Sequence, residues 1–433
     1  MDILTANDRP ATFPDSYYAS ASTLPDTRPP ARGALRYDVC VVGAGYTGLS
    51  TALHLAEKGY SVAVLEANRA GWGASGRNGG HVGTGQRLSQ GALETLVGPS
   101  RAHALWDMGL EAVALVRHRV ARHDIDCDLG DGILHACHKP SLTRQARAHA
   151  DLLRDGYGYD RIEYLDRERL LEHIGSPAYH GGTLDRGGAH LQPLAYALGL
   201  ARAAQEAGVH LYESSRVRTI SEGDPVELVT DEARVSARFA VLALNGYHGD
   251  LIPALSRRVM PINNFVAATE PLSRSVAEGL IRHGHAVADS RFVVNYFRLS
   301  RDRRLVFGGG ESYGYRFPAD IGGKVRRAMI RTYPQLADTR IEYAWGGTLA
   351  ITMNRLASFQ ALRPNVLSAS GYSGHGVPTA TFAGAVLADA IDGQAARFDL
   401  LSSLRIPPFP GGVTWRHPLL VLAMTWYALR DRL

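Results

Sequence analysis

The hydrophobic positions along the chain first describe an alternation of strand and helix. Short runs rich in β-branched residues at 38–42 and 61–66 predict strands that are buried on both faces of a parallel sheet. Between them, residues 49–58 place apolar side chains at helical spacing, and Gly59 supplies the end of such a helix. We therefore expect a right-handed βαβ unit, with regular structure beginning at Tyr37.

The same pattern returns twice further along the chain, and two other stretches interrupt it. Where the strand–helix alternation returns, we expect helices at 192–208 and 379–391 and strands at 209–213, 226–230, 238–245 and 366–370. A long helical pattern rich in Arg and His marks 98–188. Strand-like runs mark 254–343, and they are expected at 264–270, 292–299 and 304–307.

These changes of pattern predict two interleaved domains. The first is expected from residues 37–97, 189–253 and 344–395, and the second from residues 98–188 and 254–343. Residues 1–36 show no period, so we expect an extended arm that packs on the body through Tyr17 and Tyr18. Residues 396–433 are expected to form a tail with an apolar helix.

Length and charge agree with an ordinary globular protein. The 433 residues suit about two domains at roughly 100–200 residues each. The pI of about 9.1 suggests a polyanion partner, but the formal net charge is only +5 over the whole chain. Nearly all basic residues are arginines, with lysines at Lys58, Lys139 and Lys324, and no basic tail is present. We therefore expect no nucleic-acid partner.

The cysteines and the chain ends indicate a compartment. Cys40, Cys127 and Cys137 are too few and scattered for a disulfide framework, and no CxxC pair occurs. The histidines lack companions at ligand spacing, so no metal site is expected. The N-terminus has acids and prolines in place of a signal peptide, which favours the cytoplasm. The apolar run 418–429 is shorter than a bilayer span of about 20 residues, and docking on protein is favoured over membrane association.

One glycine motif indicates a dinucleotide. Gly43-x-Gly45-x-x-Gly48 lies between the first expected strand and helix. Its glycines allow a tight turn, close approach of a pyrophosphate and close helix–strand packing. Glu66, which ends the second strand, offers a carboxylate to ribose hydroxyls. The plainer alternative is a βα turn with a packing role only.

Two further glycine-rich segments separate FAD from NAD. The first, 71–80, follows the second strand almost at once, where an NAD site would continue into another crossover helix. A longer cofactor needs such backbone donors beyond its pyrophosphate. The second, 371–378, aims a helix N-terminus at an anionic or electron-accepting group. A surface loop and a packing turn are the respective alternatives.

These residues carry a family resemblance over nearly the whole chain, from about residue 16 onward. The motifs that carry it are Ser16-Tyr-Tyr-Ala19, Gly73-Ala-Ser-Gly-Arg-Asn-Gly-Gly80, Phe307-Gly-Gly-Gly-Glu311, Trp345-Gly-Gly347 and Gly371-Tyr-Ser-Gly-His-Gly376. The chain resembles the FAD-dependent oxidoreductases of the D-amino-acid oxidase, glycine oxidase and sarcosine oxidase superfamily, and within it the γ-glutamylputrescine oxidases. The resemblance implies an α/β fold: a Rossmann-like, glutathione-reductase-type FAD domain with a central parallel sheet, interleaved with an α+β substrate domain on an antiparallel sheet.

The resemblance also implies site residues. Those assigned to FAD are Gly43, Gly45, Tyr46, Thr47, Gly48, Glu66, Ala67, Ala74, Ser75, Arg77, Asn78, Gly79, Gly80, Val217, Gly371, Gly374, His375, Gly376 and Val377. Some relatives attach the flavin to a cysteine near the last motif. No cysteine follows Cys137, so we expect non-covalent FAD.

The implied reaction is oxidation of an amine C–N bond. A hydride equivalent passes to flavin N5, the imine hydrolyses to an aldehyde and ammonia, and O2 reoxidises the flavin to give H2O2. His375, as a partly cationic imidazole, and His81 are the catalytic candidates, each with a purely structural alternative. The substrate candidates are Tyr296, Arg298, Trp345 and Tyr372. Arg298, with Tyr296, could meet a substrate carboxylate, and a surface role for Arg298 is the alternative. Trp345 and Tyr372 could wall a slot for an aliphatic chain, and core packing is the alternative.

Two other functions stay open at this point. Some relatives activate O2 with a lysine near the flavin, and none of the three lysines falls in a matching segment. A dehydrogenase that passes electrons to a quinone is therefore the main alternative, and a non-catalytic flavoprotein is the other. The identity of the small-molecule amine and the oligomeric state are left open by the sequence.

Overall fold

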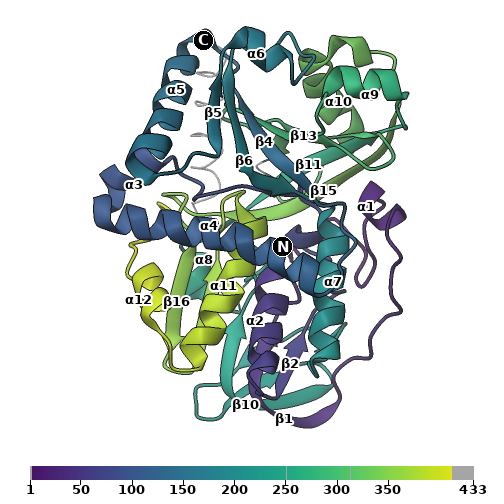
Figure 1. Cartoon of the computed structure of the whole chain (residues 1–433). Coiled ribbons are helices and arrows are strands. Elements are labelled where there is room, and N and C mark those ends of the chain that lie inside the picture. Colours follow the sequence, from purple (N-terminus) through teal and green to yellow (C-terminus); the bar gives the residue numbers. More distant parts are fainter. Residues whose placement is uncertain (1, 250, 313, 412–433) are drawn as a thin grey trace.

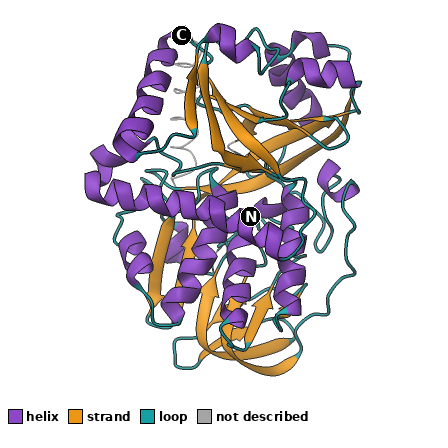
Figure 2. Ribbon diagram, in the orientation of Figure 1, coloured by secondary structure: helices purple, strands orange, loops and turns teal. Residues whose placement is uncertain are grey.

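The computed structural model describes residues 2–249, 251–312 and 314–411, which form two sheets with helices around them (Figure 1). One sheet lies in the lower half of the view and the other in the upper half. Figure 2 shows helices in front of the lower sheet and along the outer margin of the upper one.

The first sheet has a parallel centre, as the buried apolar runs predict. Its strand order is β16-β17-β10-β1-β2-β7. In addition, β9 pairs with β10, and β8 pairs with β9. β10, β1, β2 and β7 run parallel, and β17 runs parallel to β10. The strands are β1 (Gly33–Val42), β2 (Val62–Leu65), β7 (His210–Tyr212), β8 (Thr219–Ile220), β9 (Val226–Val229), β10 (Ala233–Leu242), β16 (Ser358–Arg363) and β17 (Val366–Ser370).

The expected βαβ unit is present, but two of its boundaries differ from the prediction. α2 (Tyr46–Glu57) begins three residues before position 49, directly after Gly45, because its first turn is itself buried. β1 begins at Gly33 because residues 33–37 pair with residues 233–237 of β10. The last four residues of the expected arm, 33–36, therefore belong to the first sheet.

The second sheet has nine strands in the order β15-β11-β14-β13-β12-β4-β6-β3, with β5 paired to β6. Within the described residues its pairs are antiparallel, apart from β4 with β12. The strands are β3 (His81–Val82), β4 (Gly130–Ala136), β5 (Ile162–Leu165), β6 (Gly182–His190), β11 (Met260–Thr269), β12 (Ala286–Asp289), β13 (Tyr296–Leu299), β14 (Leu305–Ser312) and β15 (Ile341–Ile351).

Two expectations about this sheet need correction. Residues 344–351 were expected in the first domain, but β15 pairs with β11 along its whole length, so backbone hydrogen bonds hold them in the second sheet. The strand expected at 292–299 forms only from Tyr296. The Asp289 carboxylate accepts hydrogen bonds from the main-chain N–H groups of Arg291 and Asn295, at 3.1 and 3.0 Å, and this folds the preceding residues into a turn.

The long helix α4 (Pro99–Arg122) runs along the boundary between the two halves (Figure 1). The sequence pattern grouped it with residues 98–188 of the second domain. Its buried residues Leu105 and Val116 instead share a hydrophobic cluster with Leu49 of α2 and Val386 of α11. α4 therefore packs on helices of the first half, because its apolar face matches theirs.

The remaining helices cover the two sheets. They are α1 (Tyr17–Ser20), α3 (Gln90–Val97), α5 (Thr143–Asp151), α6 (Arg167–Leu171), α7 (Pro193–Glu206), α8 (Pro253–Ser256), α9 (Arg274–Leu280), α10 (Ile321–Thr332), α11 (Gly376–Ile391) and α12 (Ala396–Ser402). α2, α7 and α11 contribute buried residues to one cluster with β1 and β2, and so cover one face of the parallel sheet.

The N-terminal arm is anchored at α1. Tyr17 is 8% exposed and Tyr18 is fully buried. The Tyr18 hydroxyl donates a hydrogen bond to the Asn78 carbonyl oxygen at 2.9 Å, which ties the arm to the second glycine-rich segment.

The C-terminal tail is described only in part. The apolar run expected at 418–429 lies outside the described residues. Among the residues that are described, no helix combines the length and the apolar character needed to cross a membrane.

Candidate active site

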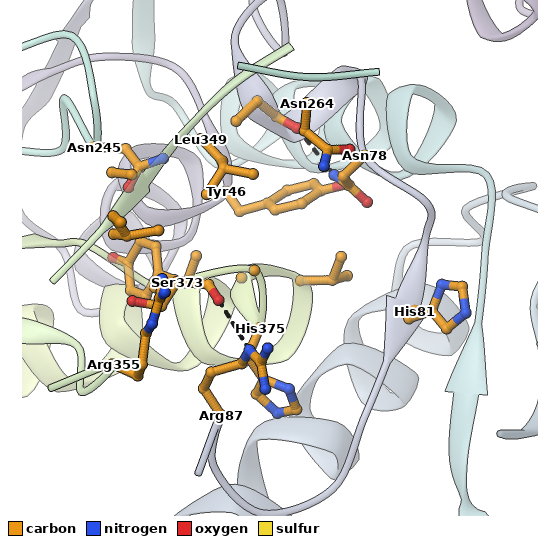
Figure 3. A pocket seen from close by; sticks show the side chains of 18 of the residues that line it. Tyr46, Asn78, His81, Arg87, Asn245, Asn264, Leu349, Arg355, Ser373 and His375 are labelled. Atoms are coloured by element: carbon orange, nitrogen blue, oxygen red, sulfur yellow. Dashed lines mark hydrogen bonds between the residues drawn. The ribbon is translucent and has the colours of Figure 1, made fainter. Parts of the chain in front are cut away.

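A large cavity lies where the two halves of the molecule meet. Its volume is about 1090 Å³, slightly above the roughly 300–1,000 Å³ of ordinary small-molecule sites. Loops of the first sheet, the start of α11 and strands of the second sheet line it together (Figure 3). A ligand that fills this cavity would touch both sheets.

Most of the residues that the sequence singles out lie around this cavity. Those that line it are Gly43, Gly45, Tyr46, Thr47, Glu66, Ala67, Ala74, Ser75, Asn78, Gly79, His81, Val217, Tyr296, Tyr372, Gly374, His375, Gly376 and Val377. The predicted residues outside its lining are Gly48, Arg77, Gly80, Arg298, Trp345 and Gly371.

The first glycine loop makes one wall of the cavity. Gly43 has φ +102, a conformation that favours glycine. A Cβ atom added at Gly45 would lie 2.9 Å from Ser75 Oγ, and that oxygen accepts a hydrogen bond from the Tyr46 main-chain N–H at 3.0 Å. The N-cap Gly45 has no side chain to cap α2, so the N–H groups of the first turn beyond Tyr46 are available to an anion.

Glu66 stands beside this loop with a fixed carboxylate. Its oxygens accept hydrogen bonds from the main-chain N–H groups of Ala44 and Asn68, both at 2.8 Å. Burial raises the pKa of Glu66 above its usual range, against the opposing effect of these two donors. Each oxygen keeps a further lone pair for a ligand hydroxyl.

The second glycine-rich segment is held in shape by Asn78. Its Nδ2 donates to the carbonyl oxygens of Ala74 and Ser75, at 3.0 and 3.1 Å, and its Oδ1 accepts from the Gly80 main-chain N–H at 2.8 Å. The side chain thus replaces regular secondary structure in this loop. It lines the cavity close to Tyr46 and Asn264 in Figure 3.

His375 caps the start of α11 and has an unusual environment. Its Nε2 is buried and has no hydrogen-bond partner among the described residues. Gly83 packs against its ring, since a Cβ atom there would lie 2.8 Å from His375 Cε1. Arg87 lies beside it in Figure 3 and donates a hydrogen bond from Nε to the Ser373 carbonyl oxygen at 3.1 Å.

The charge expected on His375 is not supported. The motif predicts a partly cationic imidazole, but burial lowers the pKa of His375 to about 4, and the positive charge of Arg87 adds to this effect. The ring is therefore neutral near pH 7. His81 is neutral for the same reason, because burial lowers its pKa to about 4.

His81 lines the cavity from a separate strand, β3, and stands apart from the other labelled side chains in Figure 3. Its Nε2 lies 3.0 Å from the Val287 carbonyl oxygen, so this nitrogen carries the hydrogen and donates it. The bond joins β3 to β12 and fixes the orientation of the ring. His81 is thus held by the second sheet while it faces the cavity.

Two predicted substrate residues line the cavity and two do not. The Tyr296 hydroxyl donates a hydrogen bond to Asn264 Oδ1, and the Tyr372 hydroxyl lies 2.6 Å from Thr47 Oγ1. Arg298 is only 1% exposed. Trp345 donates a hydrogen bond from Nε1 to the Arg77 carbonyl oxygen at 3.0 Å.

Arg298 therefore cannot take the carboxylate role that was considered for it. Its Nε donates to the Gly79 carbonyl oxygen at 3.2 Å, and its Nη1 lies 3.6 Å from Asp128 Oδ2. These contacts hold the guanidinium behind the glycine-rich segment, where it braces the loop from outside the cavity.

Arg77 has a similar bracing position instead of lining the path to the flavin. It donates to the carbonyl oxygen of Trp72 at 2.7 Å and to that of Gly346 at 3.1 Å, and it forms an ion pair with Asp8 at 2.9 Å. One buried guanidinium thus ties the arm and β15 to this loop.

The other predicted glycines outside the lining are packing positions. An added Cβ atom would lie 1.9 Å from the Gly43 carbonyl oxygen at Gly48 and 1.9 Å from the Leu191 carbonyl oxygen at Gly80. At Gly371 it would lie 2.7 Å from the Thr352 side chain. These glycines allow the backbones that form the cavity to approach each other.

Several further residues line the cavity that the sequence motifs do not indicate. They include Asp2, Leu4, Arg87, His135, Asp185, Arg216, Asn245, Asn264 and Arg355. A signal was available for Asn245, which follows a parallel strand at its carboxyl end, where ligands of such sheets bind. Asp2 and Leu4 come from the arm, and His135, Asp185 and Asn264 come from the second sheet. Arg87, Arg216 and Arg355 lie in loops, and no local pattern gives the placement of any of these residues.

Comparison with known proteins agrees with this geometry. The FAD dependent oxidoreductase family model matches residues 38–390. A probable oxidoreductase OrdL of Rhizobium meliloti is 42% identical over 401 residues, covering 92% of this chain and 93% of that protein. The gamma-glutamylputrescine oxidoreductase of Escherichia coli is 39% identical over 420 residues, covering 96% of this chain and 98% of that protein.

A solved structure shows the same fold. Glycine oxidase from Geobacillus kaustophilus superposes with a TM-score of 0.72 at 22% sequence identity, covering 86% of this chain and 99% of that one. This likeness confirms the α/β fold that the sequence predicts, and the family match confirms the resemblance seen in its motifs. The chain belongs to the FAD-dependent oxidoreductase family and is an oxidoreductase of that family.

Proposed function

We propose that this chain oxidises the C–N bond of a small amine, γ-glutamylputrescine or a related terminal amine, and yields an aldehyde, ammonia and H2O2 from O2. The observation that carries the proposal is one continuous cavity that joins three glycine-rich segments to the second sheet. It occurs in a chain that is 39% identical to the Escherichia coli gamma-glutamylputrescine oxidoreductase over 420 residues.

FAD fits the residues present. The bare backbone at Gly43 and Gly45 suits a pyrophosphate, because a side chain at either position would meet neighbouring atoms at 2.8 or 2.9 Å. Glu66 has the spare acceptors that a ribose needs. We assign the rest of the cofactor to Tyr46, Thr47, Ala67, Ala74, Ser75, Asn78, Gly79, Val217, Gly374, His375, Gly376 and Val377, all of which line the cavity.

With FAD bound, the cavity would contain an acceptor for the hydride equivalent of the carbon beside the amine. The start of α11 at Gly376 directs the positive end of a helix dipole towards the cavity, where it stabilises negative charge. His375 is neutral, so its contribution is a ring nitrogen and not a charge. The helix therefore supplies the positive field in this proposal.

The two histidines divide the remaining roles. The neutral His375 ring lines the cavity, and in this proposal it takes a proton from the substrate amine. His81 is fixed by Val287 and positions the substrate from the opposite side. Tyr296 and Tyr372 complete the walls and exclude water from the reacting carbon.

We propose that FAD is held without a covalent bond and that the enzyme works in the cytoplasm. Cys137 lines the cavity, but burial raises the pKa of its thiol to about 11, which leaves it a poor nucleophile. All three cysteines are free and buried, as suits a reducing compartment.

A peroxide assay with γ-glutamylputrescine, putrescine, sarcosine, glycine and D-alanine tests the function. With γ-glutamylputrescine we expect peroxide, ammonia and aldehyde in equal amounts, and little product from the α-amino acids. Turnover of the α-amino acids alone would overturn the substrate assignment. Purified protein without flavin absorbance would overturn the cofactor assignment as well.

One observation favours a second candidate, a dehydrogenase that passes electrons to a quinone. Among the described residues that line the cavity there is no lysine, and Lys58 is held in ion pairs with Asp389 and Asp392 on the outside. Anaerobic turnover with a soluble quinone analogue separates the two functions. Fast reduction of the quinone together with slow reaction of the reduced enzyme with O2 would select the dehydrogenase.

A further inference from the structure

One end of the cavity is built by the second sheet and carries its own polar groups. The residues that line this end come from the loop after β3, α4, the end of β4, α5 and β6, and they include Thr84, Trp106, His135, Cys137, Gln145, His149 and Asp185. None of them belongs to the three glycine-rich segments. This wall is therefore formed by side chains that the proposed cofactor site does not use.

Asp185 of β6 is held rigidly in this wall. Its Oδ1 accepts hydrogen bonds from the Tyr159 hydroxyl at 2.5 Å and from the Gly187 main-chain N–H at 2.9 Å. Its Oδ2 accepts a hydrogen bond from the Thr84 hydroxyl at 2.5 Å. The residue is 3% exposed, and every one of these donors is neutral. Asp185 is thus a buried carboxylate fixed by uncharged groups.

The described residues supply no cation to Asp185, whereas they do supply one to a comparable carboxylate. Asp289, which lines the same cavity, forms an ion pair with Arg291. His135 and His149 are the histidines beside Asp185. Burial lowers the pKa of both rings by more than the Asp185 charge raises it, so both are neutral near pH 7.

A buried carboxylate without a cation is costly, and a cationic ligand would offset the cost. Asp185 lines the cavity, and its Oδ2 keeps an acceptor lone pair for such a ligand, because the Thr84 hydroxyl is its one donor among the described residues. Thr84 directly follows Gly83, which packs on His375. The carboxylate is therefore linked through two adjacent residues to the candidate reaction centre.

The nature of the cation follows from the chemistry of the reaction. A carboxylate stabilises the protonated form of a neighbouring amine. The amine that loses hydride must be neutral, because its nitrogen lone pair forms the C=N bond. Asp185 would hinder that amine, and it suits a second ammonium group that stays charged throughout.

We propose that Asp185 determines specificity by binding a second, non-reacting ammonium group of the substrate, with Tyr159 and Thr84 as positioning residues. This inference rests on the proposed amine oxidation. It narrows the substrate class to amines with two cationic nitrogens, such as a diamine joined to an α-amino group.

A matched pair of substrates tests the proposal. γ-Glutamylputrescine carries an α-ammonium group, and N-glutarylputrescine lacks only that group while it keeps the carboxylate and the reacting amine. We expect the wild-type enzyme to prefer the first compound about 10- to 100-fold in kcat/KM, the effect of one hydrogen-bonded charge. The preference should lie in KM, since the group does not react.

The variant Asp185→Asn should lose this preference and retain kcat. The amide keeps one acceptor oxygen for Tyr159, and the Thr84 hydroxyl can turn to accept from its NH2 group, so the fold should survive. Bound-flavin absorbance and the melting temperature check this. The control Asp131→Asn, an exposed carboxylate of β4 paired with Arg117, should behave as wild type.

The outcomes distinguish a failure of the Asp185 proposal from a failure of the proposed amine oxidation. Equal use of the two compounds by the wild-type enzyme overturns the role of Asp185 without any variant, and leaves amine oxidation intact. A preference that survives in Asp185→Asn overturns it as well. If the wild-type enzyme oxidises neither compound, the proposed function itself fails.

Discussion

The main-chain N–H of Tyr46 donates a hydrogen bond to the Ser75 hydroxyl oxygen over 3.0 Å, although 29 residues separate the two in sequence. The bond joins the first turn of α2 to the second glycine-rich segment. Both segments therefore form one wall of the cavity, and a change in either one is transmitted to the other. Several measurable consequences arise from this and neighbouring contacts.

Gly45→Ala should weaken FAD binding. The new Cβ atom would lie 2.9 Å from Ser75 Oγ and would push the two segments apart. Overpacking of this kind costs about 1–3 kcal/mol, which corresponds to about 5- to 150-fold weaker binding. Flavin content after purification and titration of the apoprotein with FAD measure the effect. Gly279→Ala in α9, where the added atom meets nothing within 4 Å, should retain normal flavin.

Removal of the first 12 residues should speed the release of FAD. Asp2 and Leu4 line the cavity, and Asp2 pairs with Arg216. The Trp72 indole N–H donates to the Thr12 carbonyl oxygen at 2.8 Å and fastens the other end of this stretch. Loss of these contacts at about 1 kcal/mol each predicts an off-rate at least about tenfold higher. Flavin fluorescence after dilution follows it, and an unchanged off-rate would contradict the prediction.

Arg77→Ala should destabilise the protein more than it affects the chemistry. The guanidinium is buried, pairs with Asp8 and lies 4.4 Å from the centre of the Trp72 ring. Removal of one partner from a buried ion pair costs about 3–5 kcal/mol. Arg77→Lys should recover only part of it, because one ammonium group cannot reach three separate acceptors. Urea unfolding measures both, and the exposed substitution Arg238→Lys serves as the control.

His190 should make the fold sensitive to acid. Burial lowers its pKa to about 3, so between pH 6.5 and 3 the unfolded chain binds a proton that the folded chain does not. The free energy of unfolding should therefore fall as the pH drops below about 6.5, by up to about 1.4 kcal/mol per pH unit. Urea titrations at pH 7, 6 and 5 should show a smaller fall for His190→Gln. His283→Gln, an exposed change, should follow the wild-type curve.

Acid precipitation should release all of the flavin. Cys137 is the cysteine that lines the cavity, and its raised pKa keeps the thiol protonated at neutral pH. We expect flavin absorbance in the supernatant and a colourless pellet, with the same result for Cys137→Ser. If flavin stays in the pellet of the wild-type protein but is released from Cys137→Ser, the flavin is bound covalently to Cys137.

Local patterns were enough for the parts of the fold whose physics is local. The strand at 366–370 forms over the expected residues, and β2 lies within 61–66, because buried parallel strands need continuous apolar runs. The glycines of the first loop indicated a dinucleotide site, because the tight turn and the close approach of backbone atoms there leave no space for a side chain.

Other expectations failed where a distant partner decides. Arg298 carried the right chemistry for a carboxylate, but Gly79, 219 residues away in sequence, holds it outside the cavity. The charge of His375 depends on burial and on Arg87, which no motif encodes. The pairing of β15 with β11 likewise moved residues 344–351 from one sheet to the other.

The sequence by itself thus determined the parallel sheet, the three glycine-rich segments and the cofactor class, because each depends on neighbouring residues along the chain. The tertiary structure decided which side chains face the cavity. Thr84 and Asp185 illustrate the reason: 101 residues separate them, and only the pairing of strands brings their oxygens to 2.5 Å. The polar groups at the Asp185 end of the cavity are therefore brought together by contacts between strands, and no single segment of the sequence contains them.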